Sequence, residues 1–282
     1  MSTRREEQKA GGKQDQNRPV IGPCAYCRRV TELCRSHAVP NAVFRSISRK
    51  NNGSLIGLPK GRGKVHRTSD TGAFYLLCRA CETDFNRRFD GPLVNGLKAL
   101  DRAILAHGFG ARVSFDTDQF ARCMASVFWR CCVSPAVMYS KTNVSSRHRA
   151  AIRTVMDASP GSALRHASVR LARLYDPTPP GDGQIGQDVI SDFVLNPSPY
   201  ILKVRDGAEE RVGFDVTLFG FLIHLIVPRL PHRLNRRAEY LRRGQTELHA
   251  PAVSLFDYPP LLNAAVDAVR RADAGDVTPA AR

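Results

Sequence analysis

The spacing of apolar residues changes along the chain, and the change separates a helical middle from the segments on either side. Leu93, Leu97 and Leu100 begin a pattern with a period of about 3.6 residues, and glycines at 108 and 110 end it. A second helix is expected to begin near Asp116, whose side chain can cap free amides. The same spacing predicts helices over 93–105, 116–132, 145–156 and 161–175, with a shorter one over 41–47.

Beyond this middle region the pattern changes to that of strands. Prolines and glycines crowd residues 176–183, which predicts a loop or a boundary. Apolar runs then predict strands, and Asp206-Gly207 is a typical hairpin turn. A last amphipathic helix is expected over 261–269. The region therefore predicts a small antiparallel sheet followed by a helix, with strands over 189–195, 200–205 and 212–227.

Two Cys-x-x-Cys pairs lie in the N-terminal third, at Cys24 and Cys27 and at Cys78 and Cys81. Each pair has the spacing at which a tight turn delivers two thiolates to one ion, so we expect one tetrahedral, structural zinc site. Unrelated thiols or two disulfides are the alternatives. A redox motif fits less well, since it needs only one such pair.

The residues between and after these pairs resemble the HNH family of nucleases over residues 20–90. His37-Ala38-Val39-Pro40 matches the histidine of the family's hairpin, and Leu77–Cys81 matches the start of its helix. The resemblance implies a zinc-braced ββα-metal module that carries a second, catalytic metal. It also implies hydrolysis of phosphodiester bonds, with His37 as the general base.

The chain departs from this family at two positions. Ser36 stands where an acidic metal ligand precedes the histidine, and Glu82 stands where an asparagine or histidine follows the last cysteine. Glu82 and Asn86 are spaced to share one face of a helix, with Asp84 between them. We expect His37, Glu82 and Asn86 to form the catalytic site, with Mg²⁺ or Mn²⁺ on the oxygen ligands. A structural role for His37, even as a zinc ligand, is the alternative.

Charge favours an anionic partner. The chain of 282 residues has 42 Lys and Arg against 26 Asp and Glu, a formal net charge of +16. We expect nucleic acid, and DNA in particular, rather than a membrane, because no basic amphipathic helix accompanies the charge. A solvated basic surface without a partner is the alternative. The residues expected to contact phosphate lie in the loop 48–72 and on the helix after it: Lys60, Arg62, Lys64, Arg79, Arg87 and Arg88.

Together these patterns predict an α+β protein with a disordered tail over 1–18, a zinc-knuckle module over 19–90 and a helical region over 91–175. The sheet and last helix are expected over 176–275, and a second tail over 276–282. The charged first residues have no apolar core typical of a secretion signal, so we expect reduced cysteines and a cytoplasmic protein. The leading hypothesis is a metal-dependent, HNH-like endonuclease. The alternative is a zinc-braced, non-catalytic protein with a degenerate HNH site that binds nucleic acid or serves as an assembly protein; the sequence leaves the oligomeric state open.

Overall fold

A computed structural model of the chain describes residues 19–53, 55–57, 65–203, 210–235, 237, 239–274 and 277–278. The predicted tail over 1–18, the loop residues Lys60, Arg62 and Lys64, and the Asp206-Gly207 turn lie outside these residues. Of the predicted tail over 276–282, residues 277–278 are described and form a short strand, β13. Within them, no helix is both long enough and apolar enough to cross a membrane.

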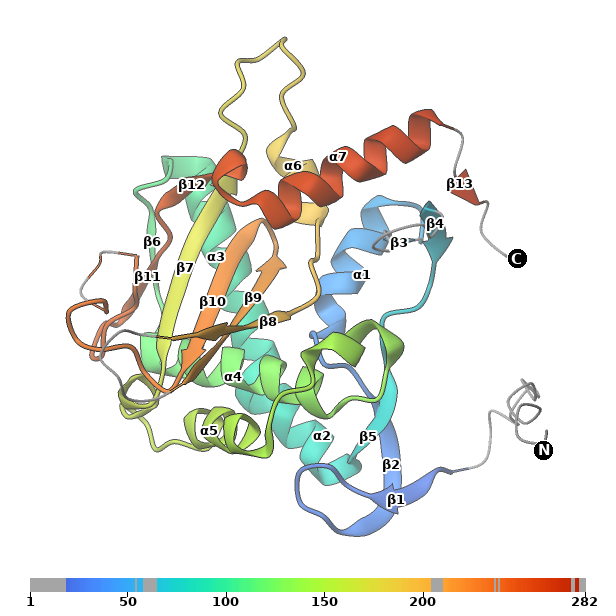
Figure 1. Cartoon of the computed structure of the whole chain (residues 1–282), viewed down its shortest axis with the longest axis vertical. Coiled ribbons are helices and arrows are strands. Elements are labelled where there is room, and N and C mark those ends of the chain that lie inside the picture. The colour runs from blue at the N-terminus through green and yellow to red at the C-terminus, as the bar shows by residue number, and fades with distance from the viewer. Residues whose placement is uncertain are drawn as a thin grey trace, which may run out of the picture.

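The chain forms an α+β protein in which a small N-terminal sheet and a larger C-terminal sheet lie on either side of central helices (Figure 1). Short helical turns, labelled η, connect several elements. The N-terminal half contains β1 (Ile21–Pro23), β2 (Val30–Ser36), α1 (Asn41–Lys50), β3 (Leu55–Gly57), β4 (Val65–Thr68), β5 (Phe74–Cys78), α2 (Arg79–Phe85), η1 (Asn86–Asp90), α3 (Gly91–His107), β6 (Arg112–Ser114) and α4 (Thr117–Val133). The C-terminal half contains η2 (Val137–Thr142), α5 (Ser146–Met156), η3 (Ala163–Arg165), β7 (Ser168–Tyr175), α6 (Gln187–Asp192), β8 (Ser198–Leu202), β9 (Arg211–Leu218), β10 (Phe221–Val227), β11 (Glu247–His249), β12 (Ala252–Ser254), η4 (Leu255–Asp257), α7 (Pro259–Asp273) and β13 (Val277–Thr278).

The N-terminal sheet has three strands in the order β1-β2-β5, and adjacent strands in it are antiparallel. Helix α2 begins directly after β5, so a hairpin and a helix meet at the second cysteine pair. Residues 37–73, which include α1, are inserted between the two hairpin strands. In Figure 1 this module lies at the lower right, next to the end of α4.

Helix α4 is the centre of the core. Asp116 caps its first turn by accepting a hydrogen bond from the amide of Asp118 at 2.8 Å, which confirms the predicted start. Nearly every residue of the helix is buried, including the only tryptophan, Trp129. A helix that is buried on all sides needs neighbours all round. One continuous apolar core accordingly runs from Cys24 to Ala250 and includes residues of both sheets.

The larger sheet has five strands in the order β12-β7-β10-β9-β8. Its centre is the β9–β10 hairpin, whose turn places Phe219 and Gly220 at positive φ. The strand pairs are antiparallel except for β12 with β7. The apolar run over 212–227 is buried strand, as its composition predicts, but it forms two strands joined by a turn rather than one.

Two sequence-based predictions are wrong. Residues 168–175 form strand β7 rather than the end of a helix over 161–175, and residues 187–192 form helix α6 rather than a strand over 189–195. Short runs with few apolar residues fit both periods, so local spacing does not decide between them. Residues 168–175 form a strand because they pair with β10, to which β7 lies antiparallel over six residue pairs.

Candidate metal centre and its histidine

The four cysteines of the two Cys-x-x-Cys pairs come together in space. Cys24 and Cys27 lie in the turn between β1 and β2, whereas Cys78 ends β5 and Cys81 lies in the first turn of α2. Their sulfur atoms all lie within 4.8 Å of one another. Sequence spacing alone predicted this cluster, and pairing of β2 with β5 brings the two turns together.

The dimensions of the cluster fit a tetrahedral zinc ion. A Zn–S bond of about 2.3 Å implies sulfur atoms about 3.8 Å apart. The sulfurs of Cys27 and Cys78 are 3.8 Å apart, and the other pairs stay within 4.8 Å. The amide of Cys78 donates to the sulfur of Cys24 at 3.3 Å, as amides around metal-bound thiolates do. Three of the cysteines are buried and Cys27 is partly buried, so the site is closed.

Electrostatics at the cluster favour thiolates on its open side. Hydrogen bonding from the side chain and backbone of Arg29 lowers the pKa of Cys27 to about 6. Burial, followed by hydrogen bonds with the other cysteines, raises the pKa of Cys81. Four thiols at this spacing cannot all ionise without a cation, and an ion of charge +2 would remove that restriction.

His37 follows β2 directly and is half-buried beside this module. Its Nε2 lies 2.8 Å from the hydroxyl of Thr71, which precedes β5. Burial and the nearby positive charge of Arg130 lower the pKa of His37, so the imidazole is neutral at pH 7. The group of side chains close enough to share one ion consists of the four cysteines and does not include His37.

Arg130 of α4 connects this histidine to the core. Its Nη1 donates to the backbone oxygen of His37 at 2.8 Å and to the Asp90 carboxylate at 3.0 Å, while Nη2 donates to the other Asp90 oxygen. Arg130 is 1% exposed and Asp90 is 9% exposed. A buried ion pair with this geometry fixes the end of β2 against α4.

Glu82 and Asn86 share one face of the helix that begins at Arg79, as their spacing predicts. The Asn86 amide donates to Glu82 Oε1 at 3.5 Å. The other carboxylate oxygen of Glu82 is buried and has no hydrogen-bond partner among the described residues. The charge of Glu82 acts on Arg130, the same side chain that contacts His37. Asn86, one turn further along, is exposed.

Ser36 has a structural role. Its side chain is buried, and its hydroxyl accepts a hydrogen bond from the Leu77 amide at 3.3 Å and donates to the oxygen of Cys34 at 3.3 Å. The hydroxyl thus bridges the irregular step between β2 and β5 at Cys34 and Arg35. The Ser36 side chain is therefore used to hold the hairpin.

The helix after the second cysteine pair carries three of the predicted phosphate contacts. Arg79 and Arg87 are exposed, and Arg88 is partly buried. Arg87 and Arg88 each contact the carboxylate of Asp84 at 2.9 Å. Such surface ion pairs contribute little to stability, so phosphate can compete for these guanidinium groups.

Sequence reasoning did not identify Thr71, Asp90 or the role of Arg130 at this site. They come from a loop, the end of η1 and α4, and no motif links them to His37. Comparisons with protein-family models, with curated proteins and with solved structures give no match. The site is therefore interpreted from its own residues.

Proposed function

We propose that this chain binds one structural zinc ion through Cys24, Cys27, Cys78 and Cys81 and acts on DNA as a metal-dependent endonuclease of the HNH kind. The closed thiolate site would brace the hairpin and α2 without taking part in the chemistry. The observation that carries the proposal is the buried carboxylate oxygen of Glu82, which has no hydrogen-bond partner among the described residues and lies on the helix that begins at the second cysteine pair.

In this proposal His37 is the general base. Its lowered pKa leaves the ring neutral at pH 7, and a contact in which Nε2–H donates to Thr71 leaves Nδ1 to accept a proton from water. Glu82 has a carboxylate oxygen without a partner among the described residues, and Asn86 adds an amide oxygen beside it. A Mg²⁺ or Mn²⁺ ion bound by such oxygens would stabilise the leaving oxygen of the phosphodiester.

Arg79 and Arg87 would hold the DNA backbone. Both are exposed on or next to the helix that carries Glu82, so a phosphate bound there would lie beside the proposed site. The formal net charge of +16 would attract the polynucleotide over a longer range.

A plasmid-nicking assay with Mg²⁺ or Mn²⁺ tests the proposal. We expect the parent to nick the plasmid and His37→Ala to lose roughly 10²–10⁴-fold in rate, as removal of a general base does. Glu82→Gln should also lose activity. His166→Ala is the matched control, because this histidine is exposed and far along the chain. Equal nicking by the parent and by His37→Ala would contradict the assignment.

Binding without cleavage is the second candidate. It is favoured by Ser36, whose hydroxyl is used in the hairpin, and by the buried positive charge of Arg130 close to His37. A cation at this place opposes the binding of a divalent ion nearby. This candidate predicts no nicking by the parent, but binding of duplex DNA that weakens steeply with salt.

An arginine variant distinguishes specific binding from a general charge effect. Arg79→Gln/Arg87→Gln should bind duplex DNA more weakly and with a shallower salt dependence than the parent. Arg102→Gln/Arg165→Gln removes the same charge from two other exposed positions and is the control. Equal losses in both double variants would leave only a non-specific attraction.

A further inference from the structure

The second face of the five-stranded sheet, opposite α4, carries a row of polar residues. On β9 and β10, residues such as Phe214 and Ile223 point into the main core. Their neighbours alternate to the other face, which places His224 of β10 there. In the strand register His224 is paired with Asp215 of β9 on one side and with Arg170 of β7 on the other. Three adjacent strands thus contribute a base, an acid and a cation at one level of the sheet.

The contacts of His224 leave one of its ring nitrogens without a partner. Nδ1 lies 2.8 Å from Asp215 Oδ1 and 3.5 Å from the Tyr200 hydroxyl. Nε2 is buried and has no hydrogen-bond partner among the described residues. Nε of Arg170 is likewise buried and unpartnered there, and it lies 3.9 Å from Glu239 Oε1. Buried nitrogen atoms without a hydrogen-bond partner on neighbouring strands are unusual and indicate a missing ligand or water.

Tyr200 lies over this row because the strand beside it has no side chain at one position. Tyr200 of β8 is paired with Gly213 of β9, and a Cβ on Gly213 would overlap the phenol ring. Burial, then the charge of Asp215 and a hydrogen bond to it, raise the pKa of Tyr200 and also that of Tyr258. Both hydroxyls therefore remain protonated at neutral pH and can donate hydrogen bonds.

A cavity of about 490 Å³ opens above these residues. Among the described residues its polar lining consists of Arg170, Lys203, His224 and Arg237, with the hydroxyls of Tyr200 and Tyr240, and none of these described residues is acidic. The carboxylates of Asp215 and Glu239 contact His224 and Arg170 but do not line the cavity. Positive charge and hydroxyl donors around a hollow of this size suit an anion that accepts several hydrogen bonds.

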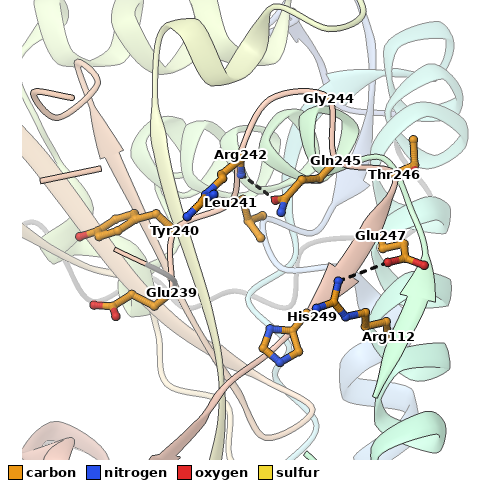
Figure 2. Close-up of a pocket in the computed structure, with 10 residues that line it drawn as sticks. All are labelled: Arg112, Glu239, Tyr240, Leu241, Arg242, Gly244, Gln245, Thr246, Glu247 and His249. Atoms are coloured by element: carbon orange, nitrogen blue, oxygen red, sulfur yellow. Dashed lines mark hydrogen bonds and ion pairs between the residues drawn. The ribbon is translucent and has the colours of Figure 1, made fainter. Parts of the chain in front are cut away.

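A neighbouring hollow on the other side of Tyr240 has a different character. Figure 2 shows that it is lined by acids as well as bases, and Arg112 pairs with Glu247 at 3.5 Å within it. The amide of Arg242 donates to Gln245 Oε1 at 2.8 Å, so the loop satisfies part of its own polar groups. Balanced charge gives this hollow, of about 410 Å³, no comparable preference for an anion.

We infer that the cavity over Arg170 and His224 binds a phosphate monoester, with an attached ring packed against Tyr200 or Tyr240. A tetrahedral phosphate has enough acceptor oxygens for guanidinium, ammonium and phenol donors at once, and a tyrosine ring is a stacking surface for a nucleobase. The ligand is either a free mononucleotide or the terminal phosphate of a polynucleotide. The site is independent of the cysteine cluster and of His37.

Calorimetry with chosen phosphate compounds tests this inference. The probes are AMP, inorganic phosphate and adenosine, followed by an oligonucleotide with and without a 5′-phosphate. We expect AMP to bind and adenosine to bind at least about tenfold more weakly, since the charged group supplies most of the interaction. Tighter binding of the 5′-phosphorylated oligonucleotide than of AMP would identify the terminal phosphate of a polynucleotide, rather than a free mononucleotide, as the ligand.

Variants assign the binding to this cavity. Lys203 and Arg237 are exposed, so Lys203→Gln/Arg237→Gln is expected to fold like the parent and to bind AMP about tenfold more weakly. Arg170→Gln should give a similar loss. Arg102→Gln/Arg165→Gln has the same net charge as the first variant and should bind like the parent. Equal affinity for adenosine and AMP, unchanged binding in the cavity variants, or an equal loss in the control would overturn the inference.

Discussion

Arg130 in the last turn of α4 donates a hydrogen bond of 2.8 Å to the backbone oxygen of His37, which directly follows β2. The two residues are 93 positions apart in the chain. The same guanidinium is paired with Asp90 at the end of η1. A single buried side chain therefore connects the cysteine module, the helix that follows it and the main core.

This connection predicts a large loss of stability in Arg130→Leu. Removing one member of a buried pair leaves the Asp90 carboxylate without a partner, which costs about 3–5 kcal/mol. The double variant Arg130→Leu/Asp90→Leu removes both charges and should be more stable than the single variant. Urea unfolding followed by circular dichroism measures both changes. A single variant that unfolds at the parent's midpoint would show that the pair contributes nothing.

The cysteine cluster predicts metal-dependent stability. Purified protein should contain about one zinc ion per chain, and Cys24→Ser should lose it and unfold at a lower temperature. Cys34→Ser is the matched control, because Cys34 is partly buried and lies outside the cluster. Elemental analysis and thermal unfolding, with and without a chelator, make the comparison. Equal zinc in parent and Cys24→Ser would rule the cluster out as the site.

The lowered pKa of His37 predicts that acid destabilises the protein through this residue. The ordinary value is 6.5, and burial and Arg130 place the folded-state pKa below it. Between these two values the unfolded chain binds more protons than the folded one. The contribution of neutral His37 to the free energy of unfolding is therefore complete above pH 6.5 and is lost as pH falls toward the folded-state pKa.

Urea unfolding between pH 8 and pH 5.5 checks this sign. His37→Gln should lose less free energy of unfolding on acidification than the parent, whereas the exposed His166→Gln should behave like the parent. Release of zinc at low pH affects parent and variants alike and cancels in the comparison. A steeper loss in His37→Gln would mean that the folded state favours the imidazolium.

The close approach of the Tyr200 ring to Gly213 predicts that β9 does not tolerate a larger side chain at this position. A methyl group there would overlap the Tyr200 ring, so Gly213→Ala should destabilise the protein by about 1–3 kcal/mol. Gly110→Ala is the matched control, since nothing lies within 4 Å of its added carbon. Thermal unfolding of both variants tests the prediction. The expectation fails if the two substitutions have the same effect.

Several features follow from the sequence by itself. The Cys-x-x-Cys spacing predicts a cluster that the structure confirms, and Asp116 correctly marks the start of α4. The apolar composition of the run over 212–227 correctly predicts buried strand, although not the turn that divides it into two strands. Each of these features depends on residues that are close together in the chain. Local chemistry is therefore enough to specify them.

Tertiary structure decided the rest. Residues 168–175 become a strand because β10 is there to pair with them, and local spacing fits a helix equally well. Arg130 reaches His37 and Asp90 only after α4 packs against the N-terminal module, and Arg170, His224 and Asp215 share one level only in the register of three paired strands. Such contacts join residues far apart in sequence, and their energies depend on burial that no local pattern contains.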